Sequence, residues 1–179
     1  LLEGVFIGVI AAVFVRTLLW INSAAPRQLW LRLVLAGGIT GTAAGFAPEI
    51  LGVGYDTVNL ALIGELSITV LIVAFVLKII TSAAAIALGM PVGIIGPTLF
   101  IGALAGGLFA FATDIFESGL SADAFYVMLG MGAMMGAVLQ APLAALMAVF
   151  ELTGNPNIIL PAMLIIIIAT VTAGQFFGI

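Results

Sequence analysis

The sequence contains no cysteine and no histidine, and only 7% of its residues are charged. Without these two residue types the chain cannot form a disulfide, a thiolate or imidazole metal site, or a Ser-His-Asp or Cys-His catalytic centre. Four lysines and arginines stand against eight aspartates and glutamates, too few to follow a nucleic-acid backbone. These absences exclude nucleic acid as a partner, and we expect neither a cofactor nor enzymatic activity.

Hydrophobic residues dominate what remains. They make up 64% of the chain, and the mean hydropathy is +1.42, whereas a soluble domain has about 25% charged residues. A soluble fold is therefore excluded. The hydrophobic character runs from Leu1 to Ile179, with no initial methionine or cleavage signal, so we expect a piece of a longer protein: residues 1–179 as a single transmembrane domain fragment.

The few charged residues divide the chain into apolar segments. A bilayer core is about 30 Å thick and takes roughly 20 helical residues. Residues 50–62 are polar and glycine-rich enough for a loop that leads into a short interfacial helix, and residues 114–123 predict a polar surface loop. The predicted spans are residues 4–21, 31–46, 66–88, 98–111, 125–150 and 158–177.

One apolar stretch is too long for a single span. Residues 79–113 carry no charge and as one helix would measure about 50 Å, so the helix must break. Three glycines and two prolines lie between Gly89 and Pro97, which places the break there. A broken backbone at membrane depth is tolerated only where protein or a watery cavity satisfies it.

The end of this break can bind an anion. We expect Pro97 at the first position of a helix preceded by Gly93 to Gly96, which leaves several backbone N–H groups without helical partners. Such an end carries roughly half a positive charge and attracts an anion without a cationic side chain. The alternative is purely structural: the glycines permit close helix crossing and Pro97 makes a kink.

Two charged residues could also act inside the membrane. Lys78 lies within a predicted span, and we expect it to extend to the interface, the alternative being that it faces protein or water. Glu151 follows a long apolar segment and could carry protons, but the sequence after it predicts a turn over residues 151–157. We therefore expect Glu151 to have a structural role.

Three ordered motifs resemble the CLC family of chloride channels and chloride/proton antiporters. Residues 93–103 (GIIGPTLFIGA) resemble the family's G-x-F-x-P segment, which continues there as P-x-L-x-x-G-A. Residues 48–55 (PEILGVGY) resemble its P-E-V-L-G-x-G-Y loop. The runs APL at 141–143, FELTG at 150–154 and ILP at 159–161 complete the likeness, which covers most of the chain and is strongest from Pro48 onward.

The resemblance implies an all-α polytopic membrane protein with broken and tilted helices, one half of a CLC-type inverted-repeat chloride channel/transporter fold. It places the chain in the second half of the membrane domain, with the first half and the final helix missing. It also implies that backbone amides hold chloride, here the N–H groups of Ile94 and Ile95. Ile95 stands where the family has phenylalanine, which leaves the amide in place but changes the apolar lining. The implied chloride-binding residues are Gly93, Ile94, Ile95, Gly96 and Pro97.

The function implied is chloride transport by chloride/proton antiport, with passive chloride conduction as the alternative. The family's gating and proton-transfer glutamates belong to the missing half, so this sequence does not separate the two. The expected partners are chloride, protons and lipid, in a multi-pass protein of the plasma membrane. The family also implies a homodimer, formed here by the helices from Phe125 to Phe150 and from Ile158 to Phe177.

The residues also bear on two other classes of protein. The run GVGYD at 52–56 resembles the G-x-G-D run of intramembrane aspartyl proteases, but its spacing is off by one. That chemistry also needs a second aspartate to share a proton, and Asp114 and Asp123 lie in the predicted polar loop. The remaining alternative is a structural membrane subunit that transports nothing.

Overall fold

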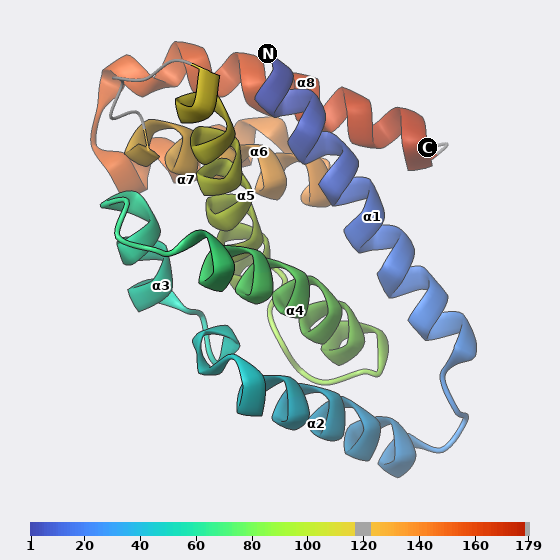
Figure 1. Cartoon of the computed structure of the whole chain (residues 1–179). Helices are drawn as coiled ribbons and strands as arrows, with labels where there is room; N and C mark the ends of the chain where they lie inside the picture. Colours follow the sequence, from blue (N-terminus) through green and yellow to red (C-terminus); the bar gives the residue numbers. More distant parts are fainter. Residues whose placement is uncertain (117–122, 178–179) are drawn as a thin grey trace.

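The computed structural model describes residues 1–116 and 123–177, and this part of the chain is built from helices (Figure 1). The eight α-helices are α1 (Leu2–Ala24), α2 (Leu29–Phe46), α3 (Tyr55–Leu62), α4 (Ile68–Ala87), α5 (Ile95–Phe116), α6 (Asp123–Leu139), α7 (Pro142–Thr153) and α8 (Ile159–Phe177), and two 3-10 turns, η1 (Pro48–Ile50) and η2 (Pro156–Ile158), lie between them.

Five helices are long and apolar enough to cross a membrane: α1, α2, α4, α5 and α8. They correspond to five of the six predicted spans, and α3 is the short helix expected after the glycine-rich loop. The prediction of an all-α membrane fold with broken helices is confirmed.

The sixth predicted span was wrong as one helix. Residues 125–150 form α6 and α7, which at about 26 Å and 18 Å are both shorter than a bilayer core. Between them Gln140 adopts a left-handed conformation with φ 52°, which ends α6. Pro142 is the first residue of α7, where its missing N–H costs no hydrogen bond.

The break between α4 and α5 is confirmed. Helix α4 ends in a Schellman motif, in which the N–H of Met90 donates to the carbonyl of Ala85 at 3.0 Å and that of Gly89 donates to Ile86 at 3.1 Å. Gly89 has φ 83°, a conformation that an L side chain rarely adopts. Pro91 follows and prevents the helix from continuing.

Three predicted boundaries need correction. Helix α5 begins at Ile95, so Pro97 is its third residue rather than its first, and the helix continues past residue 111 to Phe116. Helix α7 continues through Glu151 to Thr153, so the predicted turn over residues 151–157 begins only at Gly154. Of the predicted polar loop at 114–123, residues 117–122 lie outside the described part of the chain.

Helix α5 joins the two largest hydrophobic clusters of the molecule. Its residues Ile101 and Ala105 pack in one cluster with α1, α4, α6, α7 and α8. Phe100 and Leu104 pack in the other, with α3, α4 and η1. A helix that is apolar on all sides is stable only when it is buried, and Figure 1 shows α5 in the middle of the bundle. The middle of α5 is therefore held on several sides by its neighbours.

Candidate anion site at the start of helix α5

The first turn of α5 presents backbone N–H groups without helical partners. The first helical hydrogen bond runs from the N–H of Thr98 to the carbonyl of Ile94, at 3.1 Å. The N–H groups of Ile95 and Gly96 precede it and have no acceptor within the helix, while Pro97 has no N–H. Thr98 is fully buried and donates its hydroxyl to the carbonyl of Ile95 at 2.8 Å, which fixes the turn.

The five residues predicted to bind chloride form one continuous backbone segment that is open at its start. Gly93 and Ile95 are exposed, and Ile94, Gly96 and Pro97 are half-buried. Ile95 is 51% exposed. The geometry suits an anion that approaches the backbone, since the positive end of the helix dipole and the free N–H groups coincide.

A cavity of about 380 Å³ adjoins this segment. Its wall includes Gly93, Gly96 and Pro97 from the break and the start of α5. Thr40, on α2, lines it too, and its buried hydroxyl oxygen has no hydrogen-bond partner among the described residues. The other lining residues come from η1, from the loop after it, from α4 and from the break: Ile50, Leu51, Gly52, Val53, Lys78, Thr81, Ser82, Ala85 and Val92.

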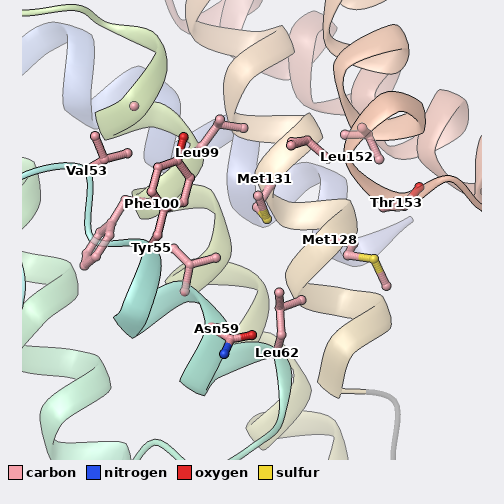
Figure 2. Close-up of a pocket in the computed structure, with 13 residues that line it drawn as sticks. Val53, Tyr55, Asn59, Leu62, Leu99, Phe100, Met128, Met131, Leu152 and Thr153 are labelled. Carbon is pink, nitrogen blue, oxygen red and sulfur yellow. The ribbon is translucent and has the colours of Figure 1, made fainter.

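A second cavity has a volume of about 340 Å³ (Figure 2). Gly96 and Val53 line both cavities. Figure 2 shows Val53 and Phe100 at one end of this cavity and Met128 at the other. Both cavities have mainly apolar walls, but Lys78 lines the first and not the second, so the first is better suited to an anion.

The expectation that Lys78 extends to the interface was wrong. Its side chain is 3% exposed, and its ammonium donates to the carbonyl oxygens of Ile50 at 2.7 Å and Gly52 at 2.8 Å. The ammonium also lies 4.5 Å from the centre of the Phe100 ring, a cation–π contact. Lys78 therefore faces protein, and it lines the cavity beside Gly93, Gly96 and Pro97.

Sequence reasoning missed one buried carboxylate. Glu3 is 1% exposed, and neither of its carboxylate oxygens has a hydrogen-bond partner among the described residues. It lines a third cavity, of about 500 Å³, between α1, α5, α6 and α8. The signal was present in the sequence, because Glu3, Ile7, Ile10 and Phe14 recur at helical spacing and all four are buried. Because Glu3 directly precedes the predicted span of residues 4–21, its place in the sequence predicts a span boundary rather than a buried side chain.

Glu151 and Asp56 do not line either cavity beside the start of α5. Glu151 is exposed in the last turn of α7, and Asp56 is exposed in the first turn of α3. The residues that the structure describes contain no group of three or more His, Cys, Asp or Glu side chains arranged to hold a metal ion. The described chemistry of the site is therefore that of backbone amides, hydroxyls and one lysine.

Comparisons of sequence and of structure both find relatives that are named chloride/proton exchangers or antiporters. Two curated proteins named H(+)/Cl(-) exchange transporter ClcA, from Salmonella arizonae and Salmonella paratyphi B, are each 34% identical over 144 residues, which cover 79% of this chain. The crystal structure of a slow cyanobacterial Cl-/H+ antiporter matches 99% of this chain with a TM-score of 0.86 and 26% sequence identity.

The chain spans 30% of the length of these curated relatives and 43% of the antiporter chain. The family model described as voltage gated chloride channel matches residues 1–174, almost the whole chain. The fold match, the two relatives and the family model agree with the motifs at the start of α5. The chain belongs to the voltage-gated chloride channel family.

Proposed function

We propose that this chain forms part of a chloride/proton antiporter and supplies one of its anion-binding helix ends, made of Gly93, Ile94, Ile95, Gly96 and Pro97. The observation that carries the proposal is the first turn of α5, whose first N–H groups have no helical acceptor and whose residues Gly96 and Pro97 line a 380 Å³ cavity together with Lys78. Relatives named as H(+)/Cl(-) exchange transporters favour antiport over passive conduction.

A backbone site suits an ion that must leave again. The helix end carries only about half a charge, so it replaces part of the hydration shell of chloride without the strong hold of a direct ion pair. Because the donors are amides, they keep their charge state at every physiological pH. The site can therefore bind chloride while protons move on other groups of the full-length protein.

The remaining expectations belong to the same proposal. The protein acts as a transporter rather than an enzyme, uses no cofactor, and works in the plasma membrane with lipid around its outer helices. Chloride and protons are its substrates. The groups that bind protons lie elsewhere in the full-length protein.

A homodimer is also proposed, through the helices from Phe125 to Phe150 and from Ile158 to Phe177. The support is an exposed apolar stripe on α8 formed by Leu160, Leu164 and Val171, spaced at i, i+4 and i+11 on one helix face. An exposed stripe of this kind must be covered by lipid or by a second copy. The family's implied dimer favours the second copy.

Chloride efflux from proteoliposomes containing the full-length parent, with a pH electrode in the external solution, tests the function. Opposing chloride and proton movement supports antiport. Chloride movement with a constant pH contradicts antiport and supports passive conduction. Absence of chloride movement from folded protein contradicts both and favours a structural subunit.

The anion site is tested by two substitutions in the same turn. Gly96→Val puts a β-branched side chain next to Val53, whose Cγ1 lies 3.4 Å from the position of a Cβ on Gly96. It should block the ion's approach and abolish measurable chloride binding, whereas Pro97→Ala should retain binding because the helix end stays open. Equal chloride affinity in Gly96→Val and wild type would remove the site from this turn.

A further inference from the structure

We propose that Lys78 is a positioning residue for the anion site: it holds the loop of residues 50–54 against the first turn of α5 and adds positive charge to the cavity wall. The inference rests on the proposed function, because it concerns how the same anion is bound. It depends on three contacts that link α4, the loop and α5.

The first contact joins α4 to the loop. The ammonium of Lys78 donates to the carbonyls of Ile50 and Gly52, which lie 28 and 26 residues earlier in the chain. Two charge-assisted hydrogen bonds to alternate residues fix both the position and the direction of the backbone between them. Lys78 therefore sets where Val53 and Gly54 lie.

The second contact joins the loop to α5. A Cβ on Gly96 would lie 3.4 Å from Cγ1 of Val53, so the valine side chain lies directly against the turn that carries the free N–H groups. One residue later, Gly54 packs so closely on the ring of Phe100 that a Cβ would overlap it. Gly54 has φ 77°, so both its backbone and its contact require glycine.

The third contact joins Lys78 to α5 through the ring of Phe100. The fully buried ring of Phe100 lies one helical turn after Gly96 and is touched by Gly54 on one side and by the Lys78 ammonium at 4.5 Å. Lys78 thus holds the loop and the ring on which the loop rests. A shift of the lysine must move the wall beside Gly96.

The charge of Lys78 acts in the same direction. Lys78 and two residues of the N-terminal turn of α5, Gly96 and Pro97, line one cavity, and both the ammonium and the turn are electropositive. Two positive groups around a common cavity oppose each other when it holds only water and are both stabilised when it holds an anion. The unpartnered hydroxyl of Thr40 offers a further donor in the same wall.

The test uses the full-length parent in detergent, with chloride affinity measured by isothermal titration calorimetry. Lys78→Met keeps the length of the side chain and removes its charge and donors, and the chloride Kd should rise about tenfold or more. Lys78→Arg keeps the positive charge and the hydrogen-bond donors, so its chloride Kd should stay within about threefold of wild type. Arg16→Met is the matched control. Arg16 also donates to a backbone carbonyl, that of Phe176 at 3.0 Å, but this bond joins α1 to α8. The chloride Kd of Arg16→Met should therefore equal that of wild type.

Thermal unfolding of the same proteins without chloride distinguishes positioning from mere support of the fold. A lower unfolding midpoint of Lys78→Met with a wild-type chloride Kd would overturn the proposal. If Lys78→Met does not fold, Val53→Ala provides the test, because it removes the contact with Gly96 at a partly exposed site; a wild-type Kd there would also overturn it. Failure of wild type to bind chloride would instead refute the proposed function on which the inference rests.

Discussion

Gly102 of α5 and Gly130 of α6 face each other so closely that a Cβ on either residue would collide with the carbonyl oxygen of the other. The two helix backbones therefore touch without any side chain between them. Small residues permit this approach in membranes, where van der Waals packing rather than the hydrophobic effect holds helices together. The contact holds α6 against the helix that begins at the proposed anion site.

Gly102→Ala should lower the free energy of unfolding by about 1–3 kcal/mol, because the added methyl group meets rigid backbone that cannot move aside. Thermal unfolding of the purified full-length parent measures the change. Gly107→Ala is the matched control on the same helix, since its nearest neighbour is the flexible end of Leu71 at 3.2 Å. Equal midpoints for the two variants would contradict the close backbone contact.

Gln140→Val should destabilise the protein by about 1–3 kcal/mol, because a β-branched residue is strained at the φ of 52° that separates α6 from α7. Gln140→Gly should be tolerated: it relieves the backbone strain and loses only the side-chain hydrogen bond to the carbonyl of Ala137 at 2.8 Å. Urea or thermal unfolding compares the two. A glycine variant less stable than the valine variant would argue against a left-handed break here.

Gly54→Ala should reduce both stability and chloride affinity more than Gly52→Ala. Both glycines have a left-handed backbone, so each substitution costs roughly 1–2 kcal/mol of strain. Only the Cβ on Gly54 would also meet Phe100, whereas the space around Gly52 is open. Unfolding midpoints and chloride titrations of the pair isolate the contribution of the ring contact, and identical values would show that it has none.

A single cysteine at Leu164 should cross-link two copies of the full-length parent in a background without other cysteines. Leu164 lies 53% exposed in the middle of the apolar stripe on α8, where a two-fold axis would bring it near its counterpart. A cysteine at Leu60, on α3 and 38% exposed, is the control and should remain monomeric on a denaturing gel. Cross-linking of both or of neither would contradict a dimer through α8.

Local features of the sequence predicted much of the fold. A charge-free stretch longer than a bilayer, with glycines and prolines at one point, required a break between α4 and α5, and the structure has it. The boundary of that break was less predictable. Helix α5 begins two residues before Pro97, because proline is accepted anywhere in the first turn, where N–H groups have no helical acceptor.

Residues 125–150 show where prediction from periodicity failed. A run of apolar residues with one proline fits either a kinked span or two short helices, and the sequence itself does not separate them. The left-handed conformation of Gln140 makes them separate helices. That conformation depends on the packing of α6 and α7 against α5 and α8, which exists only in the folded molecule.

Composition and backbone stereochemistry act locally, so the residues alone were enough to predict an all-helical membrane protein with a helix that starts near Gly93 to Pro97. The directions of the charged side chains depended instead on tertiary contacts. Lys78 could have reached the interface on its own helix, but a loop almost 30 residues away supplied two carbonyl acceptors, and Lys78 came to line the same cavity as Gly96, in the proposed anion site. Contacts between distant segments depend on how the helices pack, and no local pattern contains that information.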